Sequence, residues 1–287
     1  MKLGANVSVA KTGLLRAVEE SVSYEADTYM IYTRSNRGGP ARPIEQFNRD
    51  EALCIMSDHG LMDPVVHLSY LVNLASQKDD TFEYGVNLLT EEIKRVEYLG
   101  FQYIVMHPGS HVGTGVQAGV KRIAEGLNAI LTGREQLYIC LETMAGDGSK
   151  VGSQLEEIAE IMSLVEHRNR LAVCIDTCHN YSAGYDIVND FEGFLQQFDD
   201  VIGLPLLKVA HINDSKTSFG SHRDRHANIG RGSIGLDALR RIVRHEALET
   251  VPLILETPGG HYKHEIALLR GLADTLPPEG SAESDEA

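Results

Sequence analysis

Six short apolar runs in this chain each stop at a histidine, an aspartate or a glutamate. The runs are PVVHL, YIVMHPGSH, LYICLETMAG, AVCIDTCH, KVAHINDSK and LILETPG, and they stop at His67, His107, Glu142, Asp176, His211 and Glu256. An imidazole or carboxylate at the end of a buried strand is costly unless a charged group meets it. A single buried histidine usually has an ordinary structural role. Six such endings together predict several divalent cations at one face of a sheet or barrel.

Three further residues complete the candidate site. His179 follows Asp176 in DTCH, and Asp224 and His226 lie two apart in DRH, so that both can point to the same side of an extended loop. Five imidazoles and four carboxylates suit zinc or manganese better than calcium or magnesium alone. Nine ligands are too many for one tetrahedral ion. Three ions fit if one carboxylate bridges two of them.

The spacing of the six strand-end residues indicates the elements that position them. The steps between them are 40, 35, 34, 35 and 45 residues, about one strand plus one covering helix. A sustained period of this kind is typical of parallel β/α architecture. Two earlier units fit the period: LGANVSV with a helix at Leu14–Ser23, and TYMIYT with a helix at Ile44–His59. Eight units predict a single (β/α)8 TIM barrel over residues 1–275, with its site at the carboxyl ends of the strands.

The rest of the chain predicts a water-soluble protein without a membrane partner. No apolar run reaches the roughly 20 residues that a membrane helix needs, and the chain enters a strand almost at once, without a leader. We therefore expect a cytoplasmic protein. Nothing in the sequence indicates an obligate dimer, and we expect a monomer. Residues 276–287 are polar and acidic and are expected to be disordered.

The four cysteines do not form a disulfide framework. Cys140 and Cys174 fall in predicted strands, Cys54 falls in a predicted helix, and Cys178 lies between two candidate ligands. The spacing of Cys174 and Cys178 is not that of a zinc ribbon. Free thiols in a reducing compartment are the simplest interpretation.

The net charge of −15 at first argues against a nucleic-acid partner. The acids, however, are expected on the outer helices, in pairs such as Glu91 and Glu92. Basic residues gather in predicted loops after strands: Arg34, Arg37, Arg42, Lys216, Arg223, Arg225 and Arg231. Three divalent ions would add six positive charges to the same face. A molecule with acidic outer helices and a cationic face at the metal site could still bind DNA at that face.

Two glycine-rich segments are candidates for phosphate-binding loops. Residues 230–235 match G-x-G-x-x-G in letters, but they follow a polar loop and not a strand, which argues against a dinucleotide site. Residues 108–116 precede a predicted helix. They could receive a phosphate at its N-terminus or simply form a tight barrel turn.

Long, ordered motifs give the chain a clear resemblance. They are HPGSH at 107–111, LETMAG at 141–146, DTCHNYSAGYD at 176–186, HINDSK at 211–216, DRHANIG at 224–230 and LETP at 255–258. With GANVS near the start and HYKHEIALL near the end, nearly the whole chain resembles the endonuclease IV family of abasic-site DNA repair enzymes. The resemblance implies a (β/α)8 barrel with three zinc ions, and manganese or iron in part of the site in some members.

The resemblance also assigns the ligands. His67, His107 and Glu142 would hold one ion, and Glu142 would bridge to a second. Asp176, His211 and Glu256 would complete the second site, and His179, Asp224 and His226 would hold the third ion. The implied reaction cuts duplex DNA on the 5′ side of an abasic site, leaving a 3′-hydroxyl and a 5′-deoxyribose phosphate, and also trims blocked 3′ ends.

The residue types support that reaction independently. A phosphodiester is an anion, so its hydrolysis needs a nucleophile made at neutral pH and neutralisation of the phosphate charge. Zinc supplies the nucleophile because it lowers the pKa of bound water from about 15.7 to about 7, and its positive charge neutralises the phosphate. Glu142, as the bridging carboxylate, is the predicted catalytic residue. No nucleophilic serine or activated cysteine is required.

The resemblance also implies three DNA contacts. In the family a Tyr–Leu pair and an arginine of the second loop enter the minor groove, and here Tyr70 and Leu71 match the pair. The alternative for Tyr70 is packing against the barrel rim. Arg37 is the predicted arginine, and Arg34 or Arg42 could replace it. The chain departs from the family at Asn6, where His is usual, and at Arg231; neither is a predicted ligand.

Two other functions share some of these features. A metal-dependent sugar isomerase or epimerase has the same barrel, but it uses one or two ions with four or five ligands. It therefore gives no role to the set formed by His179, Asp224 and His226. A non-catalytic binder of damaged DNA predicts a broken ligand set, whereas all nine residues are present.

Overall fold

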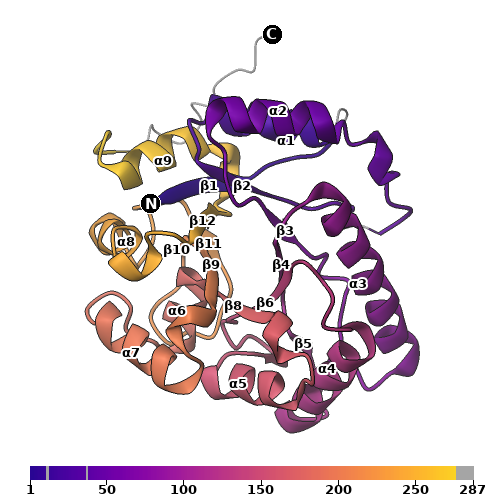
Figure 1. Cartoon of the computed structure of the whole chain (residues 1–287). Coiled ribbons are helices and arrows are strands. Elements are labelled where there is room, and N and C mark those ends of the chain that lie inside the picture. Colours follow the sequence, from indigo (N-terminus) through magenta and orange to yellow (C-terminus); the bar gives the residue numbers. More distant parts are fainter. Residues whose placement is uncertain (11–12, 37, 276–287) are drawn as a thin grey trace.

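Eight parallel strands close into a barrel in the computed structural model, which describes residues 1–10, 13–36 and 38–275 (Figure 1). The strands are β1 (Lys2–Asn6), β2 (Thr28–Ile31), β3 (Val65–His67), β4 (Tyr103–Met106), β6 (Tyr138–Glu142), β8 (Leu171–Asp176), β9 (Leu207–His211) and β12 (Pro252–Leu255). Their order around the barrel is their order in the chain, and β12 pairs with β1 to close it. The TIM barrel predicted from the strand–helix period is confirmed.

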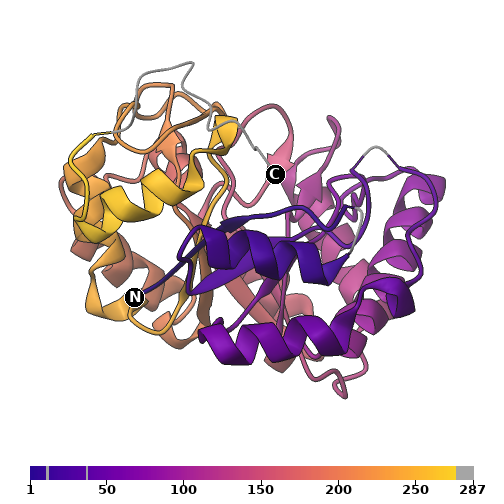
Figure 2. The same ribbon diagram turned by 90° about the horizontal axis from the view of Figure 1, so that it is seen from above.

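Helices surround the barrel and cover its outer surface (Figures 1 and 2). They are α1 (Leu14–Ser23), α2 (Arg49–His59), α3 (Asp79–Leu99), α4 (Val116–Ile130), α5 (Leu155–Leu164), α7 (Phe191–Val201), α8 (Leu236–Val243) and α9 (Tyr262–Arg270). A further short helix, α6 (Thr177–Ala183), directly follows β8 and contacts β8 and β10. Within the described part of the chain, none of them combines the length and apolar character that a membrane crossing requires.

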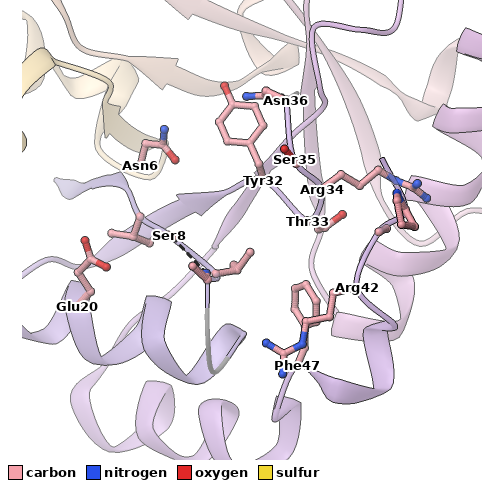
Figure 3. A pocket seen from close by; sticks show the side chains of 15 residues that line it. Asn6, Ser8, Glu20, Tyr32, Thr33, Arg34, Ser35, Asn36, Arg42 and Phe47 are labelled. Carbon is pink, nitrogen blue, oxygen red and sulfur yellow. Dashed lines mark hydrogen bonds between the residues drawn. The ribbon is translucent and has the colours of Figure 1, made fainter. Parts of the chain in front are cut away.

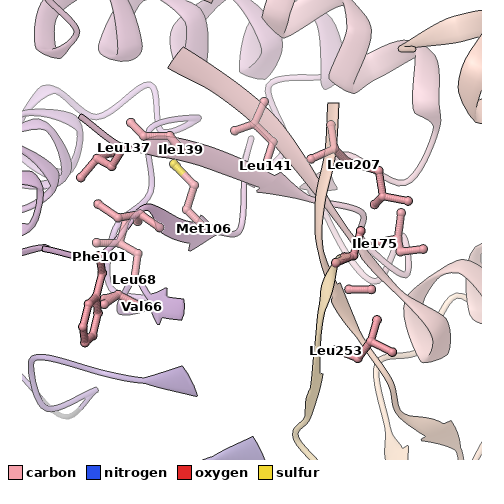
Figure 4. Packing of buried hydrophobic residues seen from close by; sticks show 14 of the residues in the cluster. Val66, Leu68, Phe101, Met106, Leu137, Ile139, Leu141, Ile175, Leu207 and Leu253 are labelled. Atoms are coloured by element: carbon pink, nitrogen blue, oxygen red, sulfur yellow. The ribbon is translucent and has the colours of Figure 1, made fainter. Parts of the chain in front are cut away.

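The buried apolar residues form two layers, because alternate residues of a strand face opposite sides of the sheet. The larger layer lies between the strands and the helices, and Figure 4 shows part of it, including Ile139 and Leu141 of β6 and Ile175 of β8. The smaller layer consists of the opposite residues of the strands and fills the barrel. Its members are Met30, Val65, Val105, Cys140, Ala172, Cys174, Val209 and Ile254. This inner layer forms the floor beneath the candidate site.

The structure differs from the prediction after β2. The helix expected over Ile44–His59 is two elements, a 3-10 turn at Ile44–Gln46 and α2 from Arg49. Asn48 between them has a left-handed backbone with φ of 53°. The carbonyl of Phe47 accepts a hydrogen bond from the backbone of Leu14 at 2.9 Å and not from within a helix. A tertiary contact therefore interrupts an otherwise helical pattern.

Two small antiparallel ribbons lie in the loops, where the sequence predicts no strands. One pairs β5 (Gly109–Ser110) with β7 (Lys150–Val151), and the other pairs β10 (Asp214–Ser215) with β11 (His226–Ala227). Each joins two segments that follow barrel strands. The ribbons thus fix loops that carry candidate ligands.

All four cysteines are free thiols, as the sequence predicts. Burial raises the pKa of Cys178 to about 11. The Cys178 thiol is therefore protonated at neutral pH, which argues against a nucleophilic role even though it lies beside the candidate ligands.

Candidate metal centre

The six strand-end residues converge because each has the same parity as the inner layer. His67 lies two residues after Val65, Glu142 two after Cys140, and Asp176 two after Cys174. The same step leads from Val105, Val209 and Ile254 to the remaining three residues. The side chains that point into the barrel are thus apolar along the strands and become His, Asp or Glu at the carboxyl ends of the strands. His107 and Glu256 lie one residue beyond β4 and β12, and the other four end their strands.

Glu142 lies at the centre of the cluster. Its Oε2 atom is 3.1 Å from His67 Nε2 and 3.3 Å from His107 Nε2. Its Oε1 atom is 3.2 Å from His211 Nδ1. Glu142 is fully buried, and its two oxygens face different histidines. This is the placement that a carboxylate bridging two cations requires.

A second group forms on the other side of Glu142. His211 Nδ1 lies 3.1 Å from Glu256 Oε2 and 3.8 Å from Asp176 Oδ2. Ligand atoms of Glu142, Asp176, His211 and Glu256 all lie within 4.8 Å of one another. Three carboxylates and one imidazole around a common point match the donor set of a divalent ion.

The third group combines α6 with the loop before β11. Asp224 Oδ1 lies 3.3 Å from His179 Nε2 and 3.4 Å from His226 Nε2. Asp176 belongs to this group as well, since its ligand atom lies within 4.8 Å of those of His179 and His226. Asp176 also caps α6 by accepting the His179 backbone N–H at 2.8 Å. The cap places His179 beside the end of β8.

The orientation of three histidine rings fits metal ligation. His67 Nδ1 donates to the Leu68 carbonyl at 2.8 Å, and His179 Nδ1 donates to the Thr143 carbonyl at 2.9 Å. His226 Nδ1 donates to the Glu256 carbonyl at 3.3 Å. A neutral ring that donates through one nitrogen presents a lone pair at the other, and here each Nε2 faces a carboxylate. A divalent cation between such a nitrogen and the carboxylate would bind both, and backbone-held histidines are the usual arrangement behind metal ligands.

Buried atoms without partners support the same interpretation. Nε2 of His179 and Nε2 of His226 have no hydrogen-bond partner within the described residues although both are buried. Buried polar atoms are rarely left unsatisfied. A cation in the third group would satisfy both.

The carboxylates are ionised in this environment. Burial alone would raise the pKa of Glu142, but the charges of His211 and His107 hold it well below the usual range. The same balance lowers the pKa of Glu256 to about 2, chiefly through His211. The cluster therefore presents anionic oxygens at neutral pH.

Asn213 supports two ligands, and the sequence interpretation missed it. Its buried side-chain amide donates to Asp176 Oδ2 at 2.7 Å and accepts the Glu256 backbone N–H at 2.9 Å. The sequence did contain a signal for it. Asn213 lies two residues after His211, so it has the same inward-facing parity as that ligand candidate and is expected near the site. Asn213 links the strand ends of β8 and β12 across β9.

Asp214 holds the loop that follows. Its two carboxylate oxygens accept backbone N–H groups from Ser215, Gly230, Gly232, Ile234 and Gly235 at 2.8–3.3 Å. A Cβ atom on Gly232 would lie 2.4 Å from Asp214 Oδ1, so only glycine fits there. The glycines at 230–235 thus bind the protein's own carboxylate, which explains why this segment is not a dinucleotide loop.

The glycine-rich segment 108–116 is also occupied by its own chain. His111 Nδ1 accepts the backbone N–H groups of Gly113 at 3.2 Å and Gly115 at 3.0 Å. These two bonds close a tight turn just before α4 begins at Val116. Of the two interpretations left open by the sequence, the structure favours the tight turn.

Two of the predicted DNA contacts, Tyr70 and Leu71, lie in the loop that follows β3 and its ligand candidate His67. Tyr70 is 59% exposed, so it does not pack against the barrel as the alternative interpretation required. Leu71 is half-buried and lies next to the second loop, where a Cβ on Gly38 would be 3.7 Å from its Cδ1 atom. Arg37 lies outside the described residues.

Arg34, one of the alternatives for the DNA-contacting arginine, is paired with carboxylates of α3. Its guanidinium forms ion pairs with Glu92 and with Glu91, the latter at 2.6 Å. Glu92, which the sequence places on the outer surface of a helix, is instead buried. The expected separation of charges is wrong at this point, because a buried carboxylate needs a paired cation and Arg34 supplies it.

A cavity of about 680 Å³ lies beside the metal centre, between the loops that follow β1 and β2 (Figure 3). Asn6, Tyr32, Asn36 and Arg42 are among its lining residues. The Tyr32 ring lies 5.0 Å from the ring of His67, which joins the cavity to the first group of ligands. Asn6, the departure from the family motif, therefore faces this cavity and contributes no contact to the nine-residue cluster that the structure records.

Comparisons with known proteins agree with this geometry. The family described as Xylose isomerase-like TIM barrel matches residues 18–276. A probable endonuclease 4 from Geobacillus sp. (strain WCH70) is 49% identical, and the alignment covers 94% of each chain. The crystal structure of endonuclease IV from Thermus thermophilus superposes with a TM-score of 0.81 at 31% identity, covering 94% of this chain and 98% of that one.

A sugar-converting relative shares only the fold. The crystal structure of a D-tagatose 3-epimerase-like protein has a TM-score of 0.71 at 18% identity, over 94% of this chain and 96% of its own. The isomerase alternative therefore has less support than the nuclease. With the matching barrel, the extent of the alignments and the full set of nine ligand-type residues, the chain belongs to the endonuclease IV family of DNA repair hydrolases, as its motifs predicted.

Proposed function

We propose that the protein hydrolyses the phosphodiester on the 5′ side of abasic sites in duplex DNA, leaving a 3′-hydroxyl and a 5′-deoxyribose phosphate. It would also remove blocking groups from 3′ ends. The observation that carries the proposal is the cluster of nine side chains in which histidine lone pairs face carboxylates. Such an array suits a polyanionic ester, whose charge must be neutralised during hydrolysis.

The nine residues would hold three zinc ions, with manganese or iron as substitutes in part of the site. His67, His107 and Glu142 would hold the first, and Glu142 would share the second with Asp176, His211 and Glu256. His179, Asp224 and His226 would hold the third. Zinc in these positions would supply a nucleophile at neutral pH and neutralise phosphate charge.

The protein's own residues orient the reaction. Glu142 Oε2 faces His67 and His107 of the first group, and its Oε1 faces His211 of the second group and His179. Asn213 and Asp214 fix the strand end and the loop that carry the remaining ligands. We propose that the protein acts as a monomer, because the nine side chains all come from one chain.

A duplex with one abasic site tests the proposed activity directly. Purified zinc-loaded protein should cut the strand once, and the fragments should carry a 3′-hydroxyl and a 5′-deoxyribose phosphate when their ends are resolved by gel and mass spectrometry. An undamaged duplex of the same sequence is the control. A duplex left whole under these conditions would refute the proposal.

Recognition of the lesion is expected to depend on Tyr70 and Leu71. An abasic site lacks one base, so unstacking is cheap there, and an exposed tyrosine with a neighbouring leucine can fill the gap. Replacing both with alanine should weaken binding to abasic duplex by about tenfold or more, since loss of one stacked contact costs roughly 1–3 kcal/mol. Binding to undamaged duplex should change much less, as measured by fluorescence anisotropy at fixed salt.

A matched control uses an exposed tyrosine elsewhere. Tyr84 on α3 is 49% exposed, and Tyr84→Ala should bind both duplexes as the unaltered protein does. Equal losses on damaged and undamaged DNA in the Tyr70/Leu71 variant would remove the wedge role. Zinc content should be the same in all three proteins, because Tyr70 is not part of the ligand cluster.

A further inference from the structure

Lys150 reaches the third ligand group from a separate loop. It lies on β7, which pairs with β5 so that Ser110 and Lys150 are opposite each other. The Ser149 carbonyl accepts the His111 backbone N–H at 2.9 Å, and the hydroxyls of Ser110 and Ser149 are 2.7 Å apart. The position of Lys150 is thus set by a fixed ribbon and not by a loose loop.

The ammonium of Lys150 lies between two carboxylates. Its Nζ atom is 2.9 Å from Asp147 Oδ1 and 3.4 Å from Asp224 Oδ2. Lys150 thus places an ammonium group beside the cluster, with a side chain that is 27% exposed.

The two oxygens of Asp224 are directed to different partners. Oδ2 faces Lys150, whereas Oδ1 faces Nε2 of His179 and Nε2 of His226. Asp224 comes from a loop and its side chain is 25% exposed, so the barrel itself does not fix its rotation. Lys150 supplies that constraint by holding the oxygen that points away from the histidines.

We propose that Lys150 is a positioning residue for the third ion: it holds Asp224 Oδ2 so that Oδ1 alone is presented, beside His179 and His226. This role rests on the three-ion site of the proposed function. Asp224 would then offer the ion a single carboxylate oxygen, and the ion could also bind a phosphate oxygen of the substrate. Partners that orient a metal ligand from behind are worth about 10–100-fold in metal affinity.

Lys150 has two opposite effects on how tightly the third ion is retained, so the direction of the change in metal release tests the proposal. A cation close to a divalent ion repels it, so removal of the charge alone would tighten retention of the metal. Loss of the constraint on Asp224 would loosen it instead. The constraint is expected to outweigh the repulsion, because Asp147 lies 2.9 Å from the same ammonium and offsets its charge.

Release of zinc to a chelator separates these outcomes. Zinc-loaded Lys150→Met should lose one of its three ions at least about tenfold faster than the unaltered protein, while the other two leave at the unaltered rate. Lys150→Arg, which keeps charge and donors, should restore most of the retention. Lys121→Met on the exposed side of α4 is the matched control and should release all ions normally. Thermal unfolding of the metal-free proteins should coincide.

Either of two results would overturn the role of Lys150. Release of the third ion from Lys150→Met at the unaltered rate would show that Asp224 needs no such partner, and slower release would show that repulsion dominates. An unaltered protein that binds fewer than three ions would instead refute the three-ion site of the proposed function, and the role of Lys150 with it.

Discussion

Replacing Glu142 with glutamine is expected to lower the rate of abasic-site cleavage by at least about 10³-fold, the scale of losing a central electrostatic contact in a reaction of this type. Glutamine has nearly the same shape, but it replaces one anionic oxygen by an NH2 donor. That donor would face either His67 and His107 or His179 and His211, whose ring nitrogens lie 3.1–3.3 Å from the carboxylate. Single-turnover cleavage of an end-labelled duplex measures the loss.

The Glu142→Gln protein should still fold and bind abasic duplex. Glu19→Gln on α1 is the matched control, since Glu19 is exposed, and its rate should be unaltered. Elemental analysis should find less than the full metal content in Glu142→Gln only. Cleavage retained within tenfold would exclude Glu142 from the bridging position and would require another carboxylate of the cluster to take it.

Replacing Asp214 with alanine should be the most destabilising single change outside the ligand set. Five backbone N–H groups would lose their acceptor at once, and a buried donor left unpaired costs about 1–3 kcal/mol. Some of the loop will relax to reach water, so the expected loss in free energy of unfolding is about 3–5 kcal/mol. The melting temperature should fall by roughly 10 °C, as measured by calorimetry.

Asp237→Ala is the control for that experiment, because Asp237 is an exposed aspartate at the start of the nearby helix α8. Asp214→Asn should be intermediate, since an amide oxygen can accept some of the N–H groups but its NH2 cannot. A melting temperature of Asp214→Ala within about 2 °C of the unaltered protein would show that the loop does not depend on this carboxylate.

The sequence predicted the barrel and the convergence of the six strand-end side chains because both depend on local periods. A strand–helix repeat determines the topology, and the strand period of two determines that Cys140 and Glu142, or Cys174 and Asp176, face the same side. The candidate metal ligands at the strand ends could be found because each His, Asp or Glu there interrupts an apolar run. The ligand assignments themselves remain predictions until metal is measured.

The supporting residues could not be predicted in the same way. Lys150 and Asp224 are far apart in the chain, and their contact depends on ribbons that no local period signals. Asp214 resembles any polar residue of a loop until the five amides around it are placed. The pairing of Arg34 with Glu92 likewise depends on how the second loop meets α3. Each is a long-range electrostatic match, for which single-sequence reasoning has no rule.

The position of β12 has a consequence for how the protein is made. β12 inserts between β9 and β1, so the same strand closes the barrel and brings Glu256 to the cluster. A ribosome delivers the chain from its N-terminus, and His67 emerges long before Glu256. A nascent chain therefore has no complete second group to load with metal. Fragments that end before β12 should therefore lack cleavage activity.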